Sequence, residues 1–250
     1  MAVIEQEIAA PVSAGGRVAQ EAIGARRLGL WLAAAGWAAM GAMWLTRSSE
    51  LFGHEQEGIV GVGLFLVGWT VMVAGMMLPS SLRTLGLVDR TAGPDTDAPR
   101  IMLGFFMPWA IFGAVGFAGD GILHLAVDTM PWLAQRPSLI AGGMAMFAGA
   151  AELVGRTPPP RLPKVGRGAG SFALGRAHAI DRIRRCWPLM LFAMAVGMAS
   201  PVWMVGLTLV MALELRPRAS THLRLVGLIV LGLGLAVVIE PGWLPVLIGG

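Results

Sequence analysis

The chain has 250 residues, of which 56% are hydrophobic and only 14% are charged, and its mean hydropathy is +0.70. A soluble protein carries about a quarter charged residues, so most of this surface is expected to face lipid. A single cysteine, Cys186, excludes a disulfide scaffold, and the apolar composition excludes a disordered chain. The net charge of +4 is then expected to set membrane topology rather than to bind nucleic acid.

Long apolar stretches define the predicted membrane spans, because a membrane-crossing helix needs about 20 apolar residues. In chain order they are residues 28–45, 58–79, 101–127, 138–152, 186–215 and 224–247. The stretch 186–215 is too long for one span, and Pro201 near its middle suits the first turn of a new helix. We therefore expect an all-α, polytopic transmembrane helical bundle of about seven spans.

The basic residues predict the orientation of these spans. With seven spans and a cytoplasmic N-terminus, all 19 Lys and Arg residues except Arg47 and Arg136 lie on the cytoplasmic side. A single span across 186–215 would move the last three arginines to the outside, so the positive-inside rule favours a hairpin there. The prediction is a multi-pass protein of a bacterial inner membrane, with its N-terminus in the cytoplasm and its C-terminus outside.

We expect one membrane domain over residues 28–250, preceded by a cytoplasmic tail at residues 1–27. Residues 155–185 are rich in Pro, Gly and Arg and are predicted to form a basic cytoplasmic loop near anionic lipid headgroups. Small residues recur at helical spacing inside the spans, which is typical of close helix packing in lipid. Examples are Ala34, Ala38 and Ala42, and Ala141, Ala145 and Gly149. The sequence contains none of the common phosphate-binding, zinc-protease or nucleophile motifs, so an enzyme is not expected.

A stripe of sulfur-containing residues is the first candidate site. Cys186, Met190, Met194 and Met198 recur at every fourth position, so they follow one face of a helix with a drift of about 40° per step. Thiolate and thioether are soft ligands that select Cu(I), whereas methionine also fills irregular interfaces between helices. The spacing alone leaves both interpretations open.

A second sulfur group, Met72, Met76 and Met77, ends the predicted span 58–79. The predicted topology places these methionines near the cytoplasmic side, at a depth similar to Cys186 and Met190. Two carboxylates, Glu152 and Glu214, close spans at the same side. Ionisable residues in a span are functional candidates because their desolvation is costly, although both glutamates can also pair with nearby arginines at the headgroups.

Asp120 and His124 lie one helical turn apart near the outer end of the predicted span 101–127. A carboxylate and an imidazole at this spacing can share a metal or a proton. An interfacial hydrogen bond is the alternative.

Two segments resemble a known family. Gly75-Met76-Met77-Leu78-Pro79-Ser80 is similar to the A-M-M-x-P-S signature of a bacterial family of unknown function described as predicted metal-binding integral membrane proteins. Cys186-Trp187-x-Leu189-Met190 resembles the end of that family's second signature, C-x-G-C-C-W-x-L-M, and Glu214 stands at the position of its later E-K element. The resemblance covers roughly residues 65–216, but Arg182, Arg184 and Arg185 replace the earlier cysteines and the glycine of that signature.

The resemblance implies metal handling. The candidate metal ligands are Met72, Met76, Met77, Cys186, Met190 and Glu214. We expect Cu(I) binding or delivery within the lipid bilayer, with no nucleic-acid partner. The alternative is a non-catalytic accessory subunit that packs against a larger membrane protein complex. The arginine substitutions favour the subunit, and the retained methionines favour copper.

Overall fold

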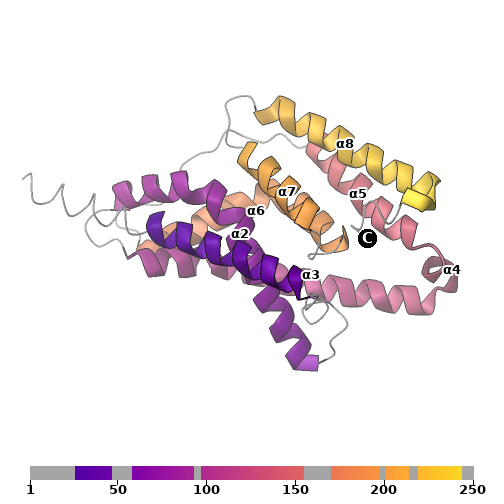
Figure 1. The fold of residues 1–250 in the computed structure, drawn as a ribbon, viewed down its shortest axis with the longest axis horizontal. Coiled ribbons are helices and arrows are strands. Elements are labelled where there is room, and N and C mark those ends of the chain that lie inside the picture. Colours follow the sequence, from indigo (N-terminus) through magenta and orange to yellow (C-terminus); the bar gives the residue numbers. More distant parts are fainter. Residues whose placement is uncertain are drawn as a thin grey trace, which may run out of the picture.

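The structure is a computed structural model that describes residues 26–46, 58–92, 97–154, 170–196, 201–213 and 219–243. Every regular element in these ranges is helical (Figure 1). After an N-terminal helix, Arg26–Leu45, the elements are α2 (Gly58–Ala92), α3 (Ala98–Thr129), α4 (Pro131–Ala134), α5 (Pro137–Val154), α6 (Ser171–Val196), α7 (Pro201–Leu213), α8 (Ala219–Ile239) and a 3-10 turn, Pro241–Trp243. The prediction of an all-α fold is confirmed for these residues.

Among the described residues, four helices are long and apolar enough to cross a membrane. They are Arg26–Leu45, Val60–Leu82, Ala98–Thr129 and Pro137–Val154, and Trp203–Ala212 and Arg224–Ile239 are shorter apolar helices. The apolar stretch 186–215 is divided as the sequence predicted, because α6 ends at Val196 and α7 begins at Pro201. The seven-span topology and the sides of the two termini stay predictions.

Helix α6 corrects the predicted basic loop. Residues 171–185 were assigned to the loop 155–185, but they form the first half of α6, which begins at Ser171 rather than at Cys186. This polar half packs against the start of α3, where Gly175 and Gly104 allow the two backbones to approach so closely that a Cβ at either position would collide with a carbonyl of the other helix. Packing against α3 therefore stabilises a helix in a segment whose composition is typical of a loop. Residues 155–169 lie outside the described residues.

Helix α2 also differs from its prediction, because it continues past Pro79 to Ala92. A proline inside a helix removes the hydrogen bond to the carbonyl four residues earlier, which is that of Gly75. In the structure the indole Nε1 of Trp37 donates to this Gly75 carbonyl at 3.0 Å. The freed carbonyl is thus satisfied by the N-terminal helix, and α2 runs on.

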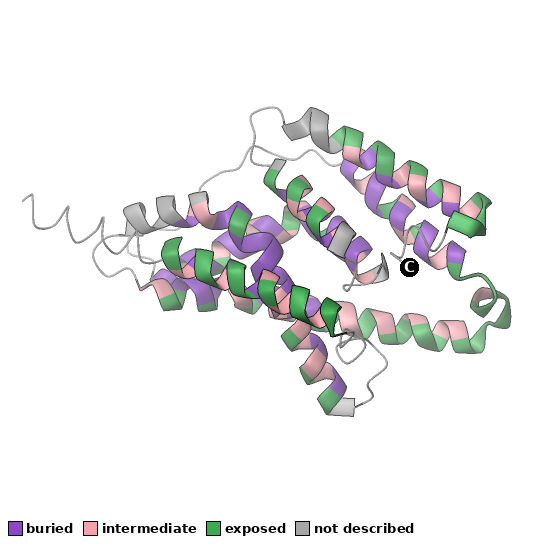
Figure 2. Cartoon of the chain, viewed as in Figure 1, coloured by how far each residue is buried: buried purple, intermediate pink, exposed green. Residues whose placement is uncertain are grey.

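Two extensive helix pairs organise the molecule, α5 with α8 and α3 with α6 (Figure 1). Helices α5 and α8 cross at two glycine pairs, Gly142 with Gly234 and Gly149 with Gly227, where backbone contacts backbone. Helix α2 contacts α3, α6 and α7, and every residue from Met72 to Leu78 is buried (Figure 2). A helix that is buried all round lies inside a bundle, so α2 carries its methionines into the core.

Candidate functional site

The methionines of α2 are in the core. Met72, Met76 and Met77 are each at most 1% exposed and belong to the main hydrophobic cluster. Adjacent residues such as Met76 and Met77 point about 100° apart on a helix, so burial of both requires neighbours on more than one side. The packing of α2 against several helices supplies them.

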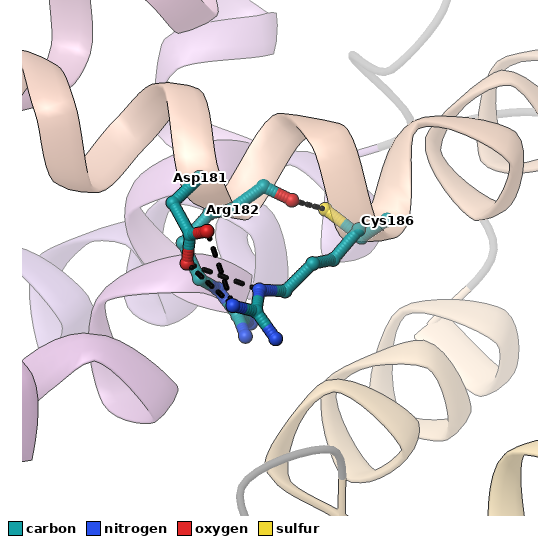
Figure 3. A network of polar contacts seen from close by, with 4 residues as sticks. Asp181, Arg182 and Cys186 are labelled. Carbon is teal, nitrogen blue, oxygen red and sulfur yellow. Dashed lines mark hydrogen bonds and ion pairs between the residues drawn. The ribbon is translucent and has the colours of Figure 1, made fainter. Parts of the chain in front are cut away.

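The sulfur residues of α6 lie in the same cluster. Cys186 and Met190 are fully buried, and Met194 packs against the cluster from a partly buried position. The Cys186 thiol donates to the backbone carbonyl of Arg182 at 3.0 Å, one turn earlier (Figure 3). Met198 falls outside the described residues. The part of the predicted stripe that the structure describes therefore faces the core.

This face of α6 continues toward its N-terminus with polar residues. His178, Arg182, Cys186 and Met190 follow one another at intervals of four and are all buried. The Pro-, Gly- and Arg-rich composition of 155–185 predicts a loop, and that prediction excludes His178 and Arg182 from the stripe. The interval of four was the signal that could have shown it.

Arg182 joins α6 to the methionine motif of α2. Its side chain is buried, its Nη2 donates to the Ser80 hydroxyl at 3.0 Å, and the same nitrogen lies 4.0 Å from the Met77 thioether sulfur. The Ser80 hydroxyl in turn donates to the Met77 carbonyl at 3.0 Å. A permanent cation is thus held beside one of the candidate copper ligands.

The two neighbouring arginines are arranged differently. Arg185 forms an ion pair with Asp181, one turn earlier on α6, with its Nη2 3.0 Å from a carboxylate oxygen. Arg184 is exposed. Among the three arginines that depart from the family signature, Arg182 is the one whose guanidinium lies 4.0 Å from the Met77 sulfur of α2 in the part of the chain that the structure describes.

His178 is the buried titratable group of this face. It lies in the part of α6 that precedes the apolar segment beginning at Cys186, and its ring stacks on Phe105 of α3 with the centroids 5.8 Å apart. Burial lowers the pKa of His178 from 6.5 to about 4, and the Arg182 charge acts in the same direction. The imidazole is therefore neutral at pH 7, and its Nε2 has no hydrogen-bond partner among the described residues.

The remaining candidates are spread over other helices. Glu152 of α5 is buried, with its Cβ close to Gly227 of α8. Glu214 lies outside the described residues. His124 and Asp120 of α3 pair through Nδ1 and Oδ2 at 3.1 Å, and the His124 side chain is 66% exposed. This pair lies at the far end of α3 from the α6 contact.

The described residues contain no group of three or more His, Cys, Asp or Glu side chains that could hold a metal ion. Methionine sulfur is a further soft donor that this part of the chain offers to Cu(I). The structure places Met72, Met76, Met77, Cys186 and Met190 in one hydrophobic cluster. The contacts of Arg182 with Met77 and Ser80 link α6 to the methionines of α2.

Comparison with known proteins adds one finding. A model of the copper chaperone family PpoB2 matches residues 66–237, which is more than half of the chain. The chain belongs to this family. The match covers the segments that carry the buried methionines and Cys186, and it agrees with the expectation of a metal-related family. A copper chaperone is by description a non-catalytic protein. No curated protein and no solved structure matches the chain.

Proposed function

We propose that this chain is a multi-pass protein of a bacterial inner membrane that binds Cu(I) and passes it on, using sulfur ligands from α2 and α6. The observation that carries the proposal is the complete burial of three α2 methionines, Cys186 and Met190 in one cluster, in a member of a copper chaperone family. The proposed ligands are Met72, Met76, Met77, Cys186, Met190 and Glu214.

The chemistry of these side chains suits a copper cargo. Thioethers are soft donors that favour Cu(I) over harder ions, and they carry no proton that copper would have to displace. Cys186 is the exception, because its thiol must lose a proton before it binds strongly as a thiolate. In this proposal Glu214 accepts that proton or serves as a hard ligand. A site made largely of uncharged sulfur can release copper to a stronger thiolate site, as a chaperone requires.

Copper binding can be measured directly. Purified full-length protein under reducing conditions is titrated against a chromophoric Cu(I) chelator, and we expect the wild type to retain stoichiometric Cu(I). Met76→Leu with Cys186→Ala should abolish binding, and each single change should weaken it less, because the remaining sulfurs still coordinate. Leucine conserves the volume of methionine well, so the fold should persist.

Met107→Leu is the matched control, because Met107 lies on α3 and is 37% exposed. It should bind copper as the wild type does. A wild-type protein that retains no Cu(I) when the ion is offered in excess would refute the proposal.

One contact favours the accessory-subunit alternative. The guanidinium of Arg182 beside Met77 places a positive charge where a cation would bind. In that case the chain lacks copper and binds a larger membrane complex through an exposed face, for which Ala34, Ala38 and Ala42 of the N-terminal helix are candidates since all three are exposed. Gly149 does not suit this role, because it packs against α8 within the chain.

A further inference from the structure

Arg182 is fixed in place by a short chain of hydrogen bonds. Ser80 donates to the Met77 carbonyl and accepts from Arg182 Nη2, so the serine bridges the methionine backbone and the guanidinium. Pro79, immediately before Ser80, leaves α2 intact at this point because Trp37 satisfies the Gly75 carbonyl. The hydrogen bonds of Ser80 on α2 therefore hold the guanidinium of Arg182 beside Met77.

The contact also places a cation against the donor atom of Met77. A thioether binds a metal through a sulfur lone pair, and the guanidinium nitrogen lies 4.0 Å from that sulfur. A copper ion at Met77 would share this space with a permanent positive charge. Copper bound to the Met77 sulfur would lie close to the guanidinium, and two like charges a few ångströms apart repel by more than thermal energy.

From these contacts we propose that Arg182 is a resident cation that caps Met77, so that Cu(I) gains this ligand only when the guanidinium leaves it. The inference rests on the proposed copper function. In the capped form copper has the sulfurs of Met72, Met76, Cys186 and Met190 available, and displacement of Arg182 adds Met77. Arg182 thus sets the affinity of the site and provides two states, weaker and tighter, between which a chaperone can load and release its cargo.

Two arginines of α6 provide a variant and its matched control. Arg182→Leu removes the charge from Met77 and keeps an apolar side chain at this buried position. Arg184→Leu removes the same charge from an exposed position of the same helix. Ser80→Ala leaves Arg182 in the chain but removes the hydroxyl that holds it.

The experiment is a double-mutant cycle between Arg182 and Met77, measured as Cu(I) affinity of the full-length protein by chelator competition. Arg182→Leu should raise the affinity about tenfold or more, whereas Arg184→Leu should leave it unchanged. Met77→Leu should have little effect in the wild type but should lower the affinity about tenfold in the Arg182→Leu background, because the uncapped sulfur then contributes. Ser80→Ala should shift the affinity in the same direction as Arg182→Leu, by a smaller factor.

A spectroscopic readout separates capping from a purely structural role. With methionine methyl groups labelled with ¹³C, and the Met77 signal assigned by its loss in Met77→Leu, Cu(I) should move that signal at lower occupancy in Arg182→Leu than in the wild type. A wild type and an Arg182→Leu variant that bind copper equally, or equal effects of Met77→Leu in both backgrounds, would overturn the inference while leaving the copper function intact. Absence of Cu(I) binding in the wild type and in every variant would instead refute the proposed function itself.

Discussion

One indole satisfies the carbonyl that Pro79 leaves without its helical donor in α2. The proline deprives the Gly75 carbonyl of its helical donor, and an unsatisfied buried carbonyl is costly. Trp37 of the N-terminal helix supplies the missing donor through its Nε1 at 3.0 Å, at a crossing where Gly36 and Gly75 let the backbones approach. The methionine motif therefore depends on a helix that contributes no ligand to it.

His178 gives a prediction about pH. The unfolded chain takes up a proton near pH 6.5, whereas the folded protein keeps the imidazole neutral until about pH 4, so the free energy of unfolding falls as the pH is lowered through this window. The loss can reach about 3 kcal/mol. His178→Phe should remove this part of the pH dependence while preserving the stacking on Phe105. Unfolding in detergent at pH 7.5 and pH 4.5 measures it, and an equal decline in both proteins would contradict the assignment.

At the scale of elements, the α5–α8 pair depends on backbone contact. A Cβ on Gly149 would lie 2.5 Å from the Leu231 nitrogen and 2.6 Å from the Gly227 oxygen. These are backbone atoms, so the neighbour cannot yield by a change of rotamer. Two helices in lipid gain little from the hydrophobic effect and associate through such close packing.

Gly149→Ala should therefore destabilise the protein by about 1–3 kcal/mol, because the helices must separate to admit a methyl group. The control is Gly143→Ala on the same helix, where a Cβ has nothing within 4 Å, and where the better helix propensity of alanine should stabilise by up to about 1 kcal/mol. Thermal unfolding of both variants in the same detergent makes the comparison. Equal stability of the two would show that the crossing tolerates a side chain.

The helices that hydropathy predicts differ physically from the first half of α6, which it does not predict. Apolar runs mark segments that face lipid or a dry core, so the N-terminal helix, α3 and α5 were foreseeable from hydropathy alone. The first half of α6 is polar, and its helical state depends on packing against α3, through Gly175 and a hydrogen bond from the Asp97 N–H to the Ser171 hydroxyl at 2.8 Å. The composition of a short segment cannot predict the contacts that it makes with residues far away in the sequence.

In the candidate site, too, the features that depend on local sequence were predictable and the long-range contacts were not. Spacing along one helix predicted that Cys186 and Met190 share a face, and both are buried. Charged residues are almost never fully buried without a partner, so a charge in this segment indicated surface, and Arg182 was not placed against Met77. That contact joins residues more than a hundred positions apart, and the fold was needed to find it.

At the scale of the whole molecule, large apolar side chains cover the outer faces of the helices. Val67 of α2, together with Leu103, Ile111, Val115, Ile122 and Leu125 of α3, is more than half exposed. Exposed apolar surface of this extent marks contact with a membrane or a partner. Since four helices in the described part of the chain are long enough to cross a bilayer, lipid is the environment that these faces fit.

The topology of the molecule can be tested by reporter fusions. The hydrogen bond between Asp97 and Ser171 places Gly170 beside the start of α3, so we expect both on one side of the membrane, and the distribution of basic residues predicts that this side is the cytoplasm. If α6 and α7 cross the membrane as the predicted hairpin, fusions at Gly170 and Thr221 should both report cytoplasm, and fusions at Gln135 and Gly250 should report the exterior. Opposite sides for Gly170 and Thr221 would mean that α6 and α7 together cross the membrane once, and the number of spans would then fall to about six.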